Sequence, residues 1–188
     1  ISFTVIFSES VTGFTGADVA LSGSAGATTA VVTGGGTTYT VAVSGMTASG
    51  TVIATVPAGN AQDVAGNGNT NSTSIDNNVT YDSTAPSVTI NQAAGQADPI
   101  NASPITFEVL FSKPVTGFTG GDITLGGTAG ATTAVVTGGG TTYTVAVSGM
   151  TSNGTVIASI PAGAATDTIG NTNTASTSTD NTVTYDTV

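Results

Sequence analysis

The feature that most constrains the fold of this chain is an internal repeat with a period of 104 residues, since residue 105 stands where residue 1 stood. Residues 1–18, ISFTVIFSESVTGFTGAD, return as ITFEVLFSKPVTGFTGGD at residues 105–122. A second block, AGATTAVVTGGGTTYTVAVSGMT, is identical in both copies and begins at Ala25 and Ala129. A tandem repeat of this length predicts two copies of one folding unit.

We place the two predicted domains at residues 1–84 and 85–188. Each is long enough to bury a core of its own. Within the repeat, apolar residues fall at every second position, as in Ile105, Phe107 and Val109. This alternation is typical of half-buried strands, and no segment has apolar residues at helical spacing. Short strands separated by turn residues therefore predict an all-β chain of two tandem two-sheet sandwiches.

The sequence predicts the structure of two connections in the repeat. We expect a hairpin at the glycines 34–36, because residues 30–32 and 39–43 flank them as apolar strands. Residues 83–86 form a short linker that Pro86 stiffens. The segment that follows it, residues 87–91, is expected to be the leading strand of the second sandwich.

The two repeats differ at their start. The first begins at Ile1, past the position that the strand at residues 87–91 has in the second repeat. We therefore expect the first sandwich to lack its leading strand, which leaves backbone groups unpaired and a gap in the core. Two interpretations are open: the 188 residues are an excerpt of a longer array, or a neighbouring chain adds the strand.

Composition excludes several classes of function. With one lysine, no arginine and a net charge of −10, the chain lacks the basic cluster that nucleic-acid binding requires. It has no histidine or cysteine for triad or thiol chemistry, so we predict that it is not an enzyme. No apolar run is long enough to span a membrane. A surface of hydroxyls and amides with a single lysine favours an extracellular location.

Calcium is the one cofactor that the residues suggest, because Asp, Asn and backbone oxygens are its usual ligands. Alternate loops of a sandwich share an end, so several polar side chains are expected to meet where the second repeat follows the linker: Asp82, Asp122, Asp167, Asn171 and Asn173. The matching set at the start of the first repeat is Asp18, Asp63, Asn67 and Asn69. The alternative is that these residues stabilise turns through bonds to nearby backbone.

The succession FSxPVTGFTGxD, AGATTAVVTGGGTTYTVAVSGM, GTVIASIPAG, DxAGNxNTAS and YDSTAPSVTI resembles bacterial immunoglobulin-like repeats over essentially the whole chain. Such repeats form long arrays in large bacterial surface and secreted proteins. The resemblance implies an immunoglobulin-like sandwich, a bacterial cell-surface location, and a stalk or adhesive role with neighbouring repeats and a surface receptor as partners. It also implies calcium at the junctions. The chain departs from the pattern at Glu9-Ser10, where Glu-Pro is usual, and at Thr168-Ile169.

Two other functions remain open. The first is a self-assembling filament subunit, in which chains polymerise by donating the leading strand to one another. The second is a carbohydrate-binding accessory module. Sugar binding usually requires exposed aromatic rings, whereas the aromatic residues here fall on the apolar strand faces and tryptophan is absent.

Overall fold

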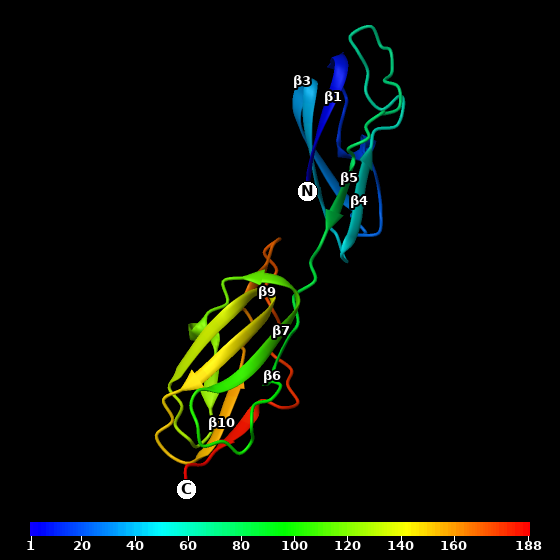
Figure 1. Ribbon diagram of the computed structural model, residues 1–188. Helices are drawn as coiled ribbons and strands as arrows, with labels where there is room; N and C mark the ends of the chain where they lie inside the picture. Colours follow the sequence, from blue (N-terminus) through cyan, green and yellow to red (C-terminus); the bar gives the residue numbers. More distant parts are fainter. The chain divides into compact units, whose positions relative to one another are not determined.

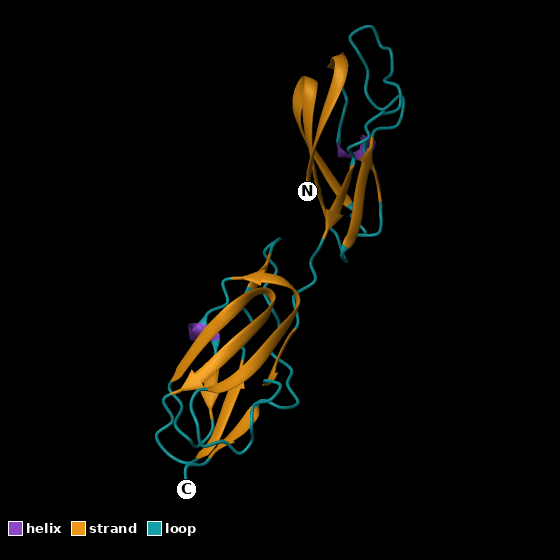
Figure 2. Ribbon diagram, in the orientation of Figure 1, coloured by secondary structure: helices purple, strands orange, loops and turns teal.

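The structure, a computed structural model of residues 1–188, is all-β, as the alternating sequence predicts (Figures 1 and 2). It divides into two compact units, residues 1–83 (unit 1) and 84–188 (unit 2). The boundary lies one residue before the one expected from the repeat. No helix in the structure is long and apolar enough to cross a membrane.

Unit 1 holds two antiparallel sheets, in the strand orders β1-β3 and β2-β4-β5. Its elements are β1 (Ser2–Val11), η1 (Gly16–Asp18), β2 (Ala20–Ser22), β3 (Thr29–Ser44), β4 (Gly50–Thr55) and β5 (Asn78–Tyr81).

Unit 2 repeats this order with two additional strands, one at its start and a two-residue strand before its last. Its first sheet has the order β11-β7-β6, with β9 also paired to β7, and its second has the order β12-β10-β8. Its elements are β6 (Val88–Gln92), β7 (Ile105–Thr116), η2 (Gly120–Asp122), β8 (Thr124–Gly126), β9 (Thr133–Ser148), β10 (Gly154–Ser159), β11 (Thr166–Asp167) and β12 (Thr182–Tyr185).

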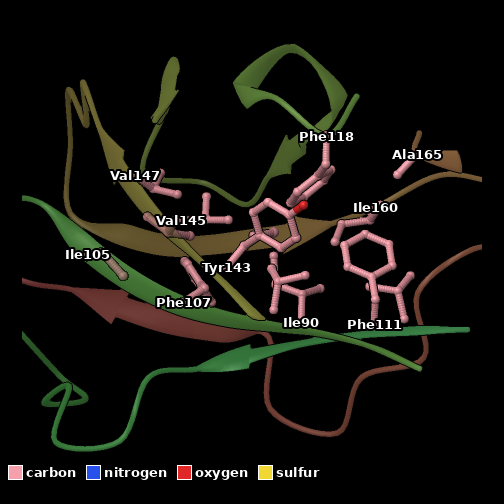
Figure 3. Close-up of a cluster of buried hydrophobic side chains, with 14 of the residues drawn as sticks. Ile90, Ile105, Phe107, Phe111, Phe118, Tyr143, Val145, Val147, Ile160 and Ala165 are labelled. Carbon is pink, nitrogen blue, oxygen red and sulfur yellow. The ribbon is translucent and has the colours of Figure 1, made fainter. Parts of the chain in front are cut away.

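The core of unit 2 lies between its two sheets, in a sandwich-like arrangement. Side chains of β6, β7 and β9 meet those of β10 and β12, and most of them are fully buried. Figure 3 shows Ile90 from β6 among the side chains of Phe107, Phe111 and Tyr143. Alternation places these apolar residues on one face of each strand, so their burial supplies most of the stability of the unit.

An aromatic cluster closes one end of each core. In unit 2, the rings of Phe111, Phe118 and Tyr143 meet edge to face, with centroids 5.2–5.8 Å apart. The Tyr143 hydroxyl donates a 3.0 Å hydrogen bond to the carbonyl of Val115. Unit 1 contains the same cluster at the equivalent positions. This geometry is the favourable one for aromatic pairs, and it satisfies the phenol inside the core.

The expected hairpin at the three glycines is wrong. β3 runs without reversal from Thr29 to Ser44, and its glycines 34–36 lie in mid-strand. Gly34 and Gly36 have positive φ angles of 113° and 67°, and the β1–β3 register shifts between Ile6 and Val11. The extra residues of this irregularity lie on β1, where residues 7–10 stand against Thr37 alone, and the glycines let β3 continue through it in a conformation that side chains would strain.

Candidate functional site

The most distinctive feature of the molecule is an open strand position in unit 1. β7 of unit 2 is paired on both edges, to β6 and to β9, whereas the equivalent β1 pairs with β3 in register from Ser2 to Ile6 and with no strand on its other edge (Figure 1). An edge strand of this kind presents a row of backbone donors and acceptors to any strand that arrives.

A groove of about 910 Å³ follows this open edge. One wall is β1 from Ser2 to Glu9, and the other is the segment 67–77 that leads into β5. Its floor includes Val41, Ala54 and Val56. Eight residues of β1 correspond to roughly 27 Å of strand, which is enough for a six-residue partner. The groove therefore has the length of a strand-binding site, and its lining combines apolar side chains such as Phe3, Val5 and Phe7 with polar ones.

The side chains along the groove are the same as those that are buried in unit 2. Phe107 and Val109 are 0% exposed and Phe111 is 2% exposed. Their counterparts Phe3, Val5 and Phe7 are only partly buried. Because the residues are identical, the difference comes from the absence of a strand over them.

In unit 2 this position is filled by β6, which runs antiparallel to β7. Val88 stands opposite Phe111, and Ile90 stands opposite Val109. Both β6 side chains are buried, at 2% and 0% exposure. The carbonyl of Ser87 accepts a hydrogen bond from the Ser112 N–H at 2.9 Å, which continues the ladder beyond β6.

The other edge of β6 contacts the C-terminal part of unit 2, with which it runs parallel. The residue numbers of the bonded partners increase together along both segments, as in a parallel pair. The pairing continues past β6 to Ile100, which forms a parallel bridge with Tyr185. The backbone bonds are Thr174 N–H to Pro86 O at 2.9 Å, Thr177 N–H to Val88 O at 3.0 Å, Gln92 N–H to Asp180 O at 2.6 Å, Ile100 N–H to Thr184 O at 2.9 Å and Asp186 N–H to Ile100 O at 2.9 Å.

The acidic residues that the sequence suggested as calcium ligands lie in separate turns. Asp167 is nearly buried, with a side chain that is 4% exposed, and it pairs with Lys113 at 3.3 Å. It accepts hydrogen bonds from the side chain and the N–H of Asn171 and from the N–H of Ile169. These bonds, the one from the Asn171 side chain foremost, hold the pKa of Asp167 well below its ordinary value, although burial opposes the shift.

Lys113 also ties the linker to unit 2. Its ammonium donates a 2.6 Å hydrogen bond to the carbonyl of Thr84, in addition to its contact with Asp167. Unit 1 has Glu9 at the equivalent position. There, Asp63 accepts from the side chain and the N–H of Asn67. These bonds, the one from the Asn67 side chain foremost, and backbone bonds from Ala65 and Gly66 lower the pKa of Asp63, although burial opposes the shift.

The remaining predicted ligands stabilise turns of their own. Asp18 and Asp122 accept from the N–H and hydroxyl of the threonine three residues earlier, Thr15 and Thr119, in capping boxes that begin η1 and η2. Asp82 accepts from the hydroxyl of Ser49.

Asn173 joins its own segment to the loop between β10 and β11, since its Oδ1 accepts from the N–H of Ala165 and its Nδ2 donates to the carbonyls of Pro161 and Thr174. Asn69 makes the matching set of bonds in unit 1. No three acidic side chains in the chain come close enough together to hold a metal ion. These contacts favour the turn-stabilising interpretation, while calcium binding stays a prediction.

Sequence reasoning located the open strand position but missed two other features. The parallel contact of residues 86–100 with the C-terminal segment has no alternating pattern on its C-terminal side, where the sequence reads TASTSTD. The role of Lys113 was also not anticipated, although its status as the one basic residue of the chain singled it out.

Comparison with known protein families, with curated proteins and with solved structures finds no match to this chain. The candidate site therefore rests on the geometry of unit 1 and on its internal comparison with unit 2.

Proposed function

We propose that this chain is a non-enzymatic structural repeat of a bacterial extracellular adhesin or surface fibre, in which it acts as an immunoglobulin-like stalk or spacer. The resemblance to bacterial immunoglobulin-like repeats supports the location and the class. The polar, nearly lysine-free surface and the tandem duplication are consistent with it. Its partners are then neighbouring copies of the repeat and a receptor on another surface.

The observation that carries the mechanical part of this proposal is the parallel contact in unit 2. Residues 86–100 precede the body of the unit and residues 174–186 end it, so a pull on the two ends of the unit draws these segments apart along their length. Because the segments are parallel, their hydrogen bonds are loaded together in shear rather than one after another. Backbone bonds that must break together resist force better than bonds that open in sequence.

Pulling the 188-residue chain by its two ends tests the proposal. We expect two unfolding events, with unit 2 opening at the higher force and releasing about 350 Å of chain, at roughly 3.3–3.6 Å per residue. Unit 1 has fewer residues and releases a shorter length, so the two events can be assigned. Asp98→Ala should lower the force for unit 2, because Asp98 accepts a 2.8 Å bond from the Thr184 N–H.

A matched control is Asp76→Ala, which changes an exposed acidic residue in unit 1. It should leave the force for unit 2 unchanged. Unfolding of unit 2 at or below the force that opens unit 1 would remove the mechanical argument.

A second candidate function is strand donation between chains, in which the protein is a filament subunit. The open groove beside β1 favours it, because polymers of this kind need an incomplete sheet that accepts a strand from another chain.

A further inference from the structure

We infer that the groove of unit 1 is a docking site for one extended peptide segment with the chemistry of β6, bound antiparallel to β1. The occupant is a leading strand from another repeat of this kind: an uncharged segment with aliphatic side chains at two alternate positions. The inference does not depend on the mechanical role, nor on donation of β6 between copies of this chain.

The side chains that would receive this strand are already fixed by the repeat. In unit 2, Val88 and Ile90 stand opposite Phe111 and Val109. The equivalent residues of unit 1 are Phe7 and Val5, and both line the groove. A strand in the same register therefore places one aliphatic side chain opposite each, where it covers apolar surface that is now partly exposed.

The backbone groups match as well. In unit 2 the N–H groups of Thr174 and Thr177 bond the carbonyls of Pro86 and Val88. Their counterparts in unit 1 are Thr70 and Thr73, and neither N–H forms a hydrogen bond.

The opposite wall provides an equivalent contact. Ser112 accepts a bond on its hydroxyl from the Ser87 N–H at 2.9 Å, and unit 1 keeps a serine at this position, Ser8. Ser8 lines the groove. Hydrogen-bonding groups for the backbone of an arriving strand are thus available on both of its sides.

Charge narrows the choice of occupant. Three carboxylates, those of Glu9, Asp63 and Asp76, lie along the groove. An acidic segment would be repelled by them, whereas residues 85–92, APSVTINQ, carry no charge.

A folded second copy of this chain is a poor donor. Its own β6 is buried in unit 2, with Ile90 at 0% exposure, so donation would open the core that the strand now fills. The occupant must instead be a segment that is not already packed in a sandwich.

The experiment adds a synthetic peptide, APSVTINQ, to the 188-residue chain and follows amide signals by NMR. We expect saturable 1:1 binding and at least tenfold slower hydrogen exchange at the N–H groups of Thr70 and Thr73. The melting temperature of unit 1 should rise with peptide concentration while that of unit 2 stays constant. A spin label on the peptide N-terminus should broaden Ser8 rather than Ser2, because the strand is antiparallel.

Three controls make the result specific. A peptide that carries Ile90→Asp should bind at least tenfold more weakly. Val5→Asp in the protein should abolish binding. Because that variant risks unfolding unit 1, Val31→Asp serves as the control variant: Val31 on β3 is 54% exposed and does not line the groove, so its replacement should leave binding unchanged.

The inference fails if no amide of unit 1 shifts at millimolar peptide, or if the Ile90→Asp peptide binds equally well. It also fails if the chain dimerises by exchanging β6 and takes up no peptide, since the occupant is then a second copy. None of these outcomes alters the force expected for unit 2, so the mechanical proposal is tested separately.

Discussion

Units 1 and 2 are two folded versions of nearly one sequence, and unit 2 alone has the leading strand β6 and the two-residue strand β11. The aromatic cluster, the long strand that continues through three glycines and the capped turn before β2 or β8 are present in both. The residues beside β6 are buried in unit 2, and their counterparts beside the open edge of β1 are partly exposed.

The long strands and the aromatic cluster define the fold, and the leading strand completes the burial of the core. Unit 1 keeps its sheet orders and its buried tyrosine without a strand at that position. The cost of the open position is therefore expected in stability and in exposed backbone, and not in topology.

Truncation of equivalent phenylalanines should separate the units most strongly. Phe107→Ala removes a fully buried ring and should destabilise unit 2 by about 4 kcal/mol. Phe3→Ala removes a ring that is partly exposed, so its cost in unit 1 should be about half as large. Urea titration followed by NMR signals from each unit measures both values, and equal costs would contradict the contrast.

Ile90→Ala should make unit 2 resemble unit 1. The side chain is 0% exposed and lies among the core aromatics, so its truncation should cost about 3 kcal/mol. Unit 1 contains no residue of β6 and should keep its stability. A matched surface control is Leu110→Ala, because Leu110 on the adjacent strand is 54% exposed and should cost under about 1 kcal/mol.

Much of this contrast could be predicted from sequence, and the reasons are visible in particular residues. Alternation at Ile105, Phe107 and Val109 predicted the strand and its buried face, and the offset of the repeat predicted the open position. The glycines 34–36 gave a wrong prediction of a hairpin, because a glycine run between two apolar stretches is also typical of a hairpin tip. Only the long-range register, in which Val11 stands opposite Gly36, shows that β3 continues through the glycines and does not reverse there.

The candidate calcium residues show a second limit of prediction from sequence. Asp and Asn at loop positions indicate either a metal site or local hydrogen bonds, and the spacing in sequence does not separate the two. Which loop atoms approach Asp167 depends on the pairing of β11 with β7 and on the reach of Lys113, both of which are tertiary features.

Acid should affect the loop of unit 2 more than that of unit 1. The folded-state pKa of Asp167 is depressed, so its contribution is fully present above the unfolded pKa of about 3.9 and is lost as the pH falls toward the folded value. Asp63 is shifted in the same direction but has no lysine partner. Between pH 5 and pH 2, the melting temperature of unit 2 should fall more steeply than that of unit 1. The Asp167→Asn substitution should remove this difference. An unchanged slope in that variant would assign the loss to other carboxylates.

Calcium should have the smallest effect. The predicted ligands already accept hydrogen bonds within their own turns, so millimolar calcium is expected to move the melting temperature of either unit by less than about 1 °C. Chelator-treated protein provides the reference. A rise of several degrees in melting temperature that is lost in Asp167→Asn or Asp63→Asn would contradict this expectation and support calcium binding at these residues.

The central claim is that the outer edge of β1 is open while that of β7 is closed by β6. Residue-resolved amide hydrogen exchange on the 188-residue chain tests it directly. The N–H groups of Glu108 and Leu110, which face β6, should exchange at least a hundredfold more slowly than those of Thr4 and Ile6 at the equivalent positions, after correction for the stability of each unit. Equal protection at the two edges would contradict the account.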